Sequence, residues 1–107
     1  SAAMRGVITV RGTLTCVYTP QLALGLALTG GESALVFRRG RARVALAVDD
    51  VDDIRVIELR HLRDTPGLDG SGGVLLGVVR HGDSLLSLVD ADLLLAACQA
   101  VPLKETA

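Results

Sequence analysis

The chain has 107 residues, of which 11 are basic and 12 are acidic, and its formal net charge is −1. This length fits one domain that can bury a core. The near-neutral charge argues against a nucleic-acid partner, because such a protein needs a basic face to neutralise phosphates. Half of the residues are hydrophobic but only 2% are aromatic, so the core must be aliphatic. No apolar run is long enough for a bilayer and no signal-peptide pattern opens the chain, so we expect a cytoplasmic protein.

We expect a single domain over residues 4–101. Residues 1–3 precede Met4 and are treated as an expression remnant outside the fold. Residues 102–107 follow the last predicted helix and are expected to form a flexible tail.

Residues 6–19 predict a β-hairpin. Apolar and β-branched residues recur on both sides of Arg11-Gly12, where the chain is expected to turn. Pro20 ends the second strand because it has no N–H to donate to a ladder. Proline also suits the first turn of a helix, so residues 20–28 are expected to form one or two helical turns.

A second hairpin is predicted further along the chain. Its strands are residues 33–38 and 42–48, and its turn is at residues 39–41, which contain a glycine. Residues 54–58 (Ile-Arg-Val-Ile-Glu) are rich in β-branched side chains and predict another short strand. Residues 58–62 are expected to form a single helical turn.

The last third of the chain predicts a loop, a hairpin and a helix. Residues 64–73 contain four glycines and a proline and are expected to form a loop. Residues 74–89 predict a third hairpin that turns at 81–83. Asp90 then stands where a helix N-cap is expected, before a short helix at 91–99.

The two ends of the sequence repeat one pattern. Residues 6–8 (Gly-Val-Ile) precede an Arg-Gly turn, an apolar strand and a Leu-rich segment, and residues 77–79 (Gly-Val-Val) precede a His-Gly turn and the same order of elements. Two related halves with five to seven short strands and little helix predict an all-β fold that is barrel-like.

Charged residues gather in two consecutive runs, first Arg38, Arg39, Arg41 and Arg43, then Asp49, Asp50, Asp52 and Asp53. We interpret this alternation as a solvated hairpin, with a phosphate or nucleic-acid site as the alternative. The acidic run lacks the glycine and the terminal glutamate of an EF-type loop, so a solvated strand end is favoured over a calcium site.

Residues suited to catalysis are not arranged in a known pattern. His61 and His81 have no serine or cysteine in a nucleophile context, so a catalytic triad has little support. Residues 70–73 are glycine-rich but lack the Lys-Ser/Thr pair of a Walker loop. Cys16 and Cys98 form no CxxC motif and are expected to be buried free thiols. We therefore do not expect an enzyme.

Three segments, in order, resemble the CheW-like domain family. Residues 6–12 (Gly-Val-Ile-Thr-Val-Arg-Gly) resemble its Gly-Val-Ile-Asn-Leu-Arg-Gly signature, with Thr9 in place of the Asn. Residues 44–54 resemble its apolar strand followed by Val-Asp-x-Val-x-x-Val, and residues 77–90 resemble its closing segment. The resemblance implies two small β-barrel-like halves with short helices, no cofactor and no enzymatic activity. It implies an adaptor that bridges transmembrane chemoreceptors to a histidine kinase.

One departure concerns the stretch before the Arg-Gly motif, which is much longer in the family than here. We therefore expect the first barrel-like half to be incomplete, and the kinase-binding surface to be reduced or lost. The shortened pattern is similar to accessory couplers of myxobacterial motility systems. The partners that the resemblance implies are the cytoplasmic domain of a methyl-accepting chemoreceptor, a CheA-like histidine kinase, or another CheW-like protein.

Arg11 is the residue that we single out for binding. Its guanidinium offers five fixed donors that suit a carboxylate or carbonyl on a partner helix. The alternative is an intramolecular pair with a carboxylate of the 49–53 run. The predicted partner-binding residues, which would line a groove between the two halves, are Ile8, Val10, Arg11, Gly12, Val78 and Arg80.

An incomplete first half also leaves an open sheet edge, which needs a partner strand or self-association to cover it. The alternative function is therefore a structural module that forms a homodimer and modulates a receptor–kinase array.

Overall fold

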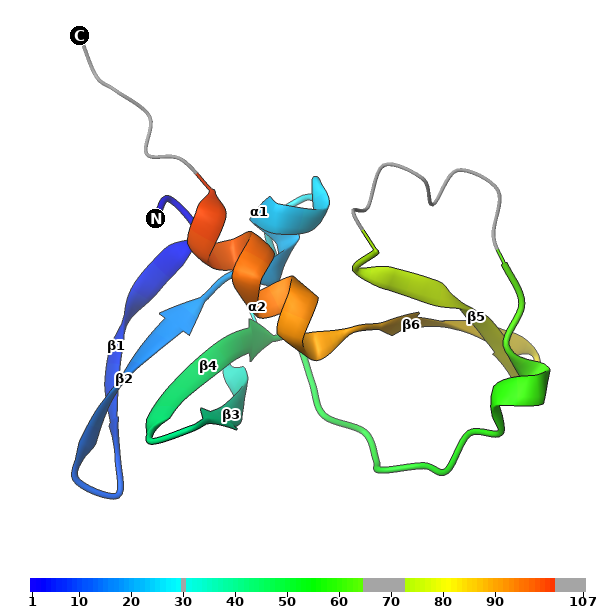
Figure 1. Ribbon diagram of the computed structural model, residues 1–107, viewed down its shortest axis with the longest axis horizontal. Helices are drawn as coiled ribbons and strands as arrows, with labels where there is room; N and C mark the ends of the chain where they lie inside the picture. The colour runs from blue at the N-terminus through cyan, green and yellow to red at the C-terminus, as the bar shows by residue number, and fades with distance from the viewer. Residues whose placement is uncertain (30, 65–72, 102–107) are drawn as a thin grey trace, which may run out of the picture. The chain divides into compact units, whose positions relative to one another are not determined.

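The computed structural model describes residues 1–29, 31–64 and 73–101 (Figure 1). Its elements are β1 (Met4–Val10), β2 (Thr13–Tyr18), α1 (Pro20–Leu24), β3 (Ser33–Arg39), β4 (Ala42–Val48), a 3-10 turn η1 (Leu59–His61), β5 (Leu75–His81), β6 (Ser84–Val89) and α2 (Ala91–Ala100). The chain divides into two compact units. Unit 1 comprises Ser1–Asp52 together with the described residues 95–101, and unit 2 comprises Asp53–Leu94.

Unit 1 contains a four-stranded sheet in the order β1-β2-β4-β3 (Figure 1). β1 and β2 are antiparallel, β2 and β4 are parallel, and β4 and β3 are antiparallel. The two predicted hairpins are confirmed, and each turns through two residues that include a glycine, as tight β-hairpins prefer. α1 and β3 lie between β2 and β4 in sequence and provide the crossover that a parallel pair of strands requires. The strand order leaves β1 and β3 at the two edges of the sheet.

One face of this sheet carries small buried side chains. Val17, Ala45 and Ala47 form its buried cluster. Side chains alternate between faces along a strand, and the register therefore places the following residues on the same side, called here the Val17 face: Ile8, Val10, Thr15, Val17, Ala34, Val36, Arg38, Arg43, Ala45 and Ala47. The opposite face contributes Tyr18, Val44 and Leu46 to the buried residues, so the core predicted to be aliphatic uses side chains of both faces.

Unit 2 contains the antiparallel hairpin of β5 and β6, which confirms the third predicted hairpin. Asp90 caps the helix that follows, because its Oδ1 accepts a hydrogen bond from the Leu93 N–H at 3.0 Å. This is the N-cap geometry predicted from the sequence. The Asp90 N–H itself donates to the Val74 carbonyl at 2.7 Å and holds the start of α2 beside the start of β5.

The strand predicted at residues 54–58 is wrong, because this segment has no regular secondary structure. Ile54 and Val56 are 95% and 98% exposed. β-branched residues favour a strand only where a sheet edge is available for pairing. The outer edge of β5 is already occupied, since Arg63 and Val78 exchange two backbone hydrogen bonds of 2.8 and 2.7 Å. The helical turn predicted at 58–62 is confirmed as η1.

The all-β class is confirmed, with both sheets open and not closed into barrels. The predicted loop falls mostly on residues 65–72 and the predicted tail on 102–107, and both lie outside the described residues.

Residues 1–3 contact the end of α2: the Ser1 hydroxyl donates to the Cys98 carbonyl at 2.5 Å and the Ala2 N–H donates to the Val101 carbonyl at 3.1 Å. In the described chain, neither helix has the length and apolarity needed to cross a bilayer.

Gly77 cannot be replaced without strain. Its φ is +147°, and an added Cβ would lie 2.5 Å from the Arg63 carbonyl oxygen. We expect Gly77→Ala to lower the free energy of unfolding by about 1–3 kcal/mol. Gly6→Ala is the matched control, because its Cβ would meet nothing within 4 Å. Urea denaturation compares the two, and equal stability of both variants would contradict the close approach.

The two cysteines are free thiols, as predicted, with Cys98 buried and Cys16 half-buried. Burial raises the pKa of the Cys98 thiol. A raised pKa lowers the thiolate fraction at mildly alkaline pH, so we expect iodoacetamide to modify Cys98 more slowly than Cys16 in the folded protein. Mass spectrometry measures both rates, and they should converge in denaturant. Faster modification of Cys98 in the native state would contradict its burial.

Candidate functional site

Arg11 occupies a strained position in the turn between β1 and β2. Its φ is +48° and that of Gly12 is +79°. Two consecutive residues with positive φ are typical of a type I′ turn, where Asn and Gly are preferred. Arg11 is the one non-glycine residue with positive φ in the described chain, and this conformation costs an L-residue roughly 1–2 kcal/mol. Turn geometry therefore does not account for an arginine here.

Two further arginines join Arg11 at this end of the sheet. A pocket of about 370 Å³, called here the arginine pocket, is lined by Val10, Arg11, Val36, Arg38 and Arg43. Arg38 and Arg43 are direct cross-strand partners, and like charges placed opposite each other destabilise a sheet. Within the described residues, none of the three arginines forms an ion pair. The pocket is therefore an uncompensated positive site.

The structure does not show the intramolecular pair considered for Arg11. Asp49 accepts a hydrogen bond from the Thr29 hydroxyl, and Asp50 and Asp53 each accept one from the backbone N–H of the next residue at 2.8 Å. These three carboxylates thus accept hydrogen bonds from groups other than Arg11, and Arg11 lies on an exposed turn. This favours the binding interpretation of Arg11.

A second pocket of unit 1 contains another predicted site residue, Ile8, which is 40% exposed. This pocket, called here the apolar pocket, also has a volume of about 370 Å³. Its lining includes Val17, Ala34 and Ala47 of the Val17 face and Arg5 at its margin. Both pockets are lined by residues of β1 and β3, so the two edge strands of the sheet flank the same surface.

The remaining predicted residues, Val78 and Arg80, lie on β5 in unit 2. They line a pocket of about 650 Å³ together with His61, Arg63 and Leu85 and with Gly82 of the hairpin turn. Val78 is half-buried and Arg80 is exposed. The structure thus brings the predicted residues together in two groups, one in each unit, and the predicted groove between the halves stays a prediction.

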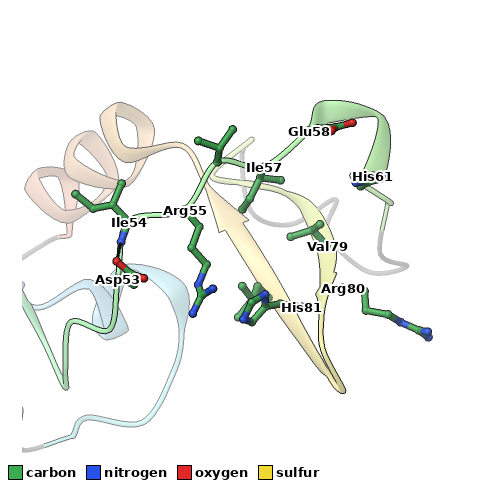
Figure 2. Close-up of a pocket in the computed structure, with 11 residues that line it drawn as sticks. Asp53, Ile54, Arg55, Ile57, Glu58, His61, Val79, Arg80 and His81 are labelled. Atoms are coloured by element: carbon green, nitrogen blue, oxygen red, sulfur yellow. Dashed lines mark hydrogen bonds between the residues drawn. The ribbon is translucent and has the colours of Figure 1, made fainter.

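A further pocket of unit 2, of about 530 Å³, lies where the segment Asp53–Glu58 passes β5 and β6. Figure 2 shows the side chains of Arg55 and His81 directed into it, whereas Arg80 points away. Glu58 forms an ion pair with Arg60. In the part of the chain that the structure describes, no three His, Cys, Asp or Glu side chains are placed to hold a metal ion.

Sequence reasoning identified Arg11 but missed its association with Arg38 and Arg43. The interpretation of the basic run as a solvated hairpin fits Arg38, which is exposed, whereas Arg43 is half-buried. The alternation of side chains within the predicted hairpin could have associated Arg38 with Arg43, because it places both positions on one face.

The CheW-like domain family model matches residues 1–99 of the chain. Among solved structures, the fold is similar to that of the scaffolding protein TtCheW from Thermoanaerobacter tengcongensis, with a TM-score of 0.70 and 16% sequence identity over 88% of this chain and 67% of that chain. Identity this low shows a shared fold alone. None of the curated protein sequences is significantly similar to this chain. The resemblance seen in the sequence is confirmed: the chain belongs to the CheW-like domain family.

Proposed function

We propose that this protein is a non-catalytic, cytoplasmic adaptor of a chemotaxis-type array, which binds the helical cytoplasmic tip of a methyl-accepting chemoreceptor. Membership of the CheW-like family supports a scaffold role in chemotaxis. The observation that carries the receptor-binding proposal is Arg11, an exposed guanidinium held at positive φ with no intramolecular ion pair in the described chain.

The surroundings of Arg11 suit one end of a partner helix. Its planar guanidinium matches a carboxylate in a two-point hydrogen bond, which a lysine could not reproduce. Ile8 and Val10 precede it on the same face of β1 and are partly exposed. A helix with an acidic residue beside an apolar stripe would satisfy both features, as helices bound in grooves do.

Val78 and Arg80 supply the second proposed contact. They place an apolar side chain and an arginine on neighbouring positions of one face of β5, since their Cα partners are Ser87 and Leu85 of β6. The proposed receptor surface therefore uses the same pair of residue types in each unit.

The proposal extends to the kinase, for which we expect weaker binding than for the receptor. β1 and β3 each pair on one side within the described chain, so the first half of the fold lacks the closed wall that a barrel would present. A partner that requires that wall would bind poorly, whereas binding through Arg11 would be unaffected.

Replacing Arg11 with glycine separates folding from binding. Glycine tolerates positive φ, so Arg11→Gly should raise the free energy of unfolding by up to about 1 kcal/mol. The same change removes the guanidinium and should abolish retention on an immobilised receptor signalling domain, and Arg11→Glu should do the same. Arg41→Gly is the control, because it removes an exposed arginine from the other turn of unit 1. Undiminished retention of both Arg11 variants would exclude Arg11 from the interface.

The kinase proposal is tested by separate pull-downs on immobilised receptor domain and immobilised kinase regulatory domain. We expect the Kd for the kinase to exceed that for the receptor by about tenfold or more, which corresponds to the loss of at least one good contact, about 1.4 kcal/mol. Surface plasmon resonance gives both constants, and equal affinities would contradict the reduced kinase surface.

A further inference from the structure

Two strand edges of unit 1 border one pocket. The apolar pocket is lined by three consecutive residues of β1, at positions 6–8, and by residues 33 and 34 of β3. Consecutive side chains of a strand point to opposite faces, so a pocket that contacts all of them lies against the backbone edge itself. In the described chain, β3 forms no backbone hydrogen bond outside its pairing with β4, and β1 forms one outside its pairing with β2, from the Met4 N–H to Ser1. The pocket therefore opens between two edges that are free along most of their length.

These two edges run in the same direction and end at the arginine pocket. β1 is antiparallel to β2, β2 is parallel to β4, and β4 is antiparallel to β3. Val10 of β1 and Val36 and Arg38 of β3 line the arginine pocket. At the opposite end, the Arg5 side chain donates to the Gly31 carbonyl at 3.3 Å and bridges the two edges. Strands separated by one intervening strand lie about 10 Å apart, which an extended arginine with its hydrogen bond can span.

The Val17 face determines which side chains a segment between the edges would carry. If the segment pairs antiparallel with β3, its first, third and fifth residues lie beside Arg38, Val36 and Ala34 on this face. Arg38 and Arg43 form no ion pair in the described chain, so the first position favours a carboxylate. Val36 is 45% exposed and offers an apolar contact to the third position. Ala34 is small and leaves the apolar pocket to a large side chain at the fifth.

Backbone pairing favours an extended segment over a helix at this place. The N–H and C=O groups of an exposed edge require hydrogen-bond partners. A helix pairs its own backbone groups internally and would leave both edges as they are. An extended segment supplies partners to β1 and to β3 at once.

We propose that unit 1 binds an extended segment of another protein as a fifth strand between β1 and β3, antiparallel to both, with an acidic residue first and large apolar residues third and fifth. The acidic side chain pairs with Arg38 and Arg43, and the apolar side chains cover Val36 and fill the apolar pocket. Strand addition of this kind draws affinity from main-chain hydrogen bonds and specificity from pockets for alternate side chains. The segment would also cover Ile8 and Val10, so it and the proposed receptor helix are alternative occupants of this surface. The proposal does not rest on receptor binding.

Three synthetic peptides with one composition test the binding. The first, acetyl-Asp-Thr-Val-Gln-Ile-Thr-Val-amide, matches the seven-residue length of both edge strands. The second, acetyl-Asp-Val-Thr-Ile-Gln-Val-Thr-amide, directs its acidic and apolar side chains to opposite faces, and the third is the first in reverse order. Fluorescence anisotropy with the full chain should give saturable binding of the first peptide and a Kd about tenfold or more higher for the other two. Absence of saturable binding, or equal affinity for the second peptide, would overturn the proposal, and equal affinity for the reversed peptide would overturn the direction.

Amide hydrogen exchange distinguishes strand addition from docking of side chains alone. Saturation with the first peptide should slow exchange of the outward amides of both β1 and β3, because they gain hydrogen-bond partners. NMR measures these rates residue by residue. Binding without protection of either edge would contradict backbone pairing.

Charge reversal tests the acidic position. Arg38→Asp should weaken binding of the first peptide about tenfold or more, and it places an acid opposite Arg43, which favours the fold. Arg39→Asp is the matched control, since Arg39 follows Arg38 on β3 but points to the opposite face. The double variant Arg38→Asp/Arg43→Asp should prefer a peptide that begins with Arg over one that begins with Asp. Equal weakening by Arg39→Asp, or an unchanged preference of the double variant, would exclude this pair as the acid site.

Discussion

The pairing of backbone groups at the edges of the four-stranded sheet is the constraint on which the rest of the structure depends. Each interior strand has two partners, whereas β1 and β3 have one each. Unpaired N–H and C=O groups must meet water or another chain, and proteins commonly place charge at such edges to prevent indiscriminate pairing. Arg5 on β1 and Arg38 and Arg39 on β3 supply that charge here. A basic strand would therefore be repelled at these edges, whereas an acidic strand would be attracted.

Arg11 illustrates how a local cost in stability accompanies an interaction surface. Glycine or asparagine would suit its positive φ, and the neighbouring positive charges of Arg38 and Arg43 add repulsion. Within the described residues, no ion pair to Arg11, Arg38 or Arg43 offsets these costs. Strained residues and uncompensated charges of this kind are typical of sites that are completed by a partner.

The elements that could be predicted from the sequence are those fixed by local chemistry. The three hairpins follow from glycine-containing turns between apolar runs, and the Asp90 cap follows from its position before a Leu-rich segment. Residues 54–58 have the same β-branched composition but pair with no strand of the described chain, so composition alone does not determine pairing. The arginine pocket could not be predicted, because it depends on how β1 and β3 flank one surface across two intervening strands.

The contacts of Ser1 and Ala2 with Cys98 and Val101 have a kinetic consequence. They join residues nearly a hundred positions apart in the sequence, so they form only after the hairpin of β1 and β2, whose turn is local. Contacts of such high sequence separation slow folding, because the closure entropy of a long loop is lost before the contact forms. Until then β1 is held by its pairing with β2 alone, and its other edge has no partner in the described chain.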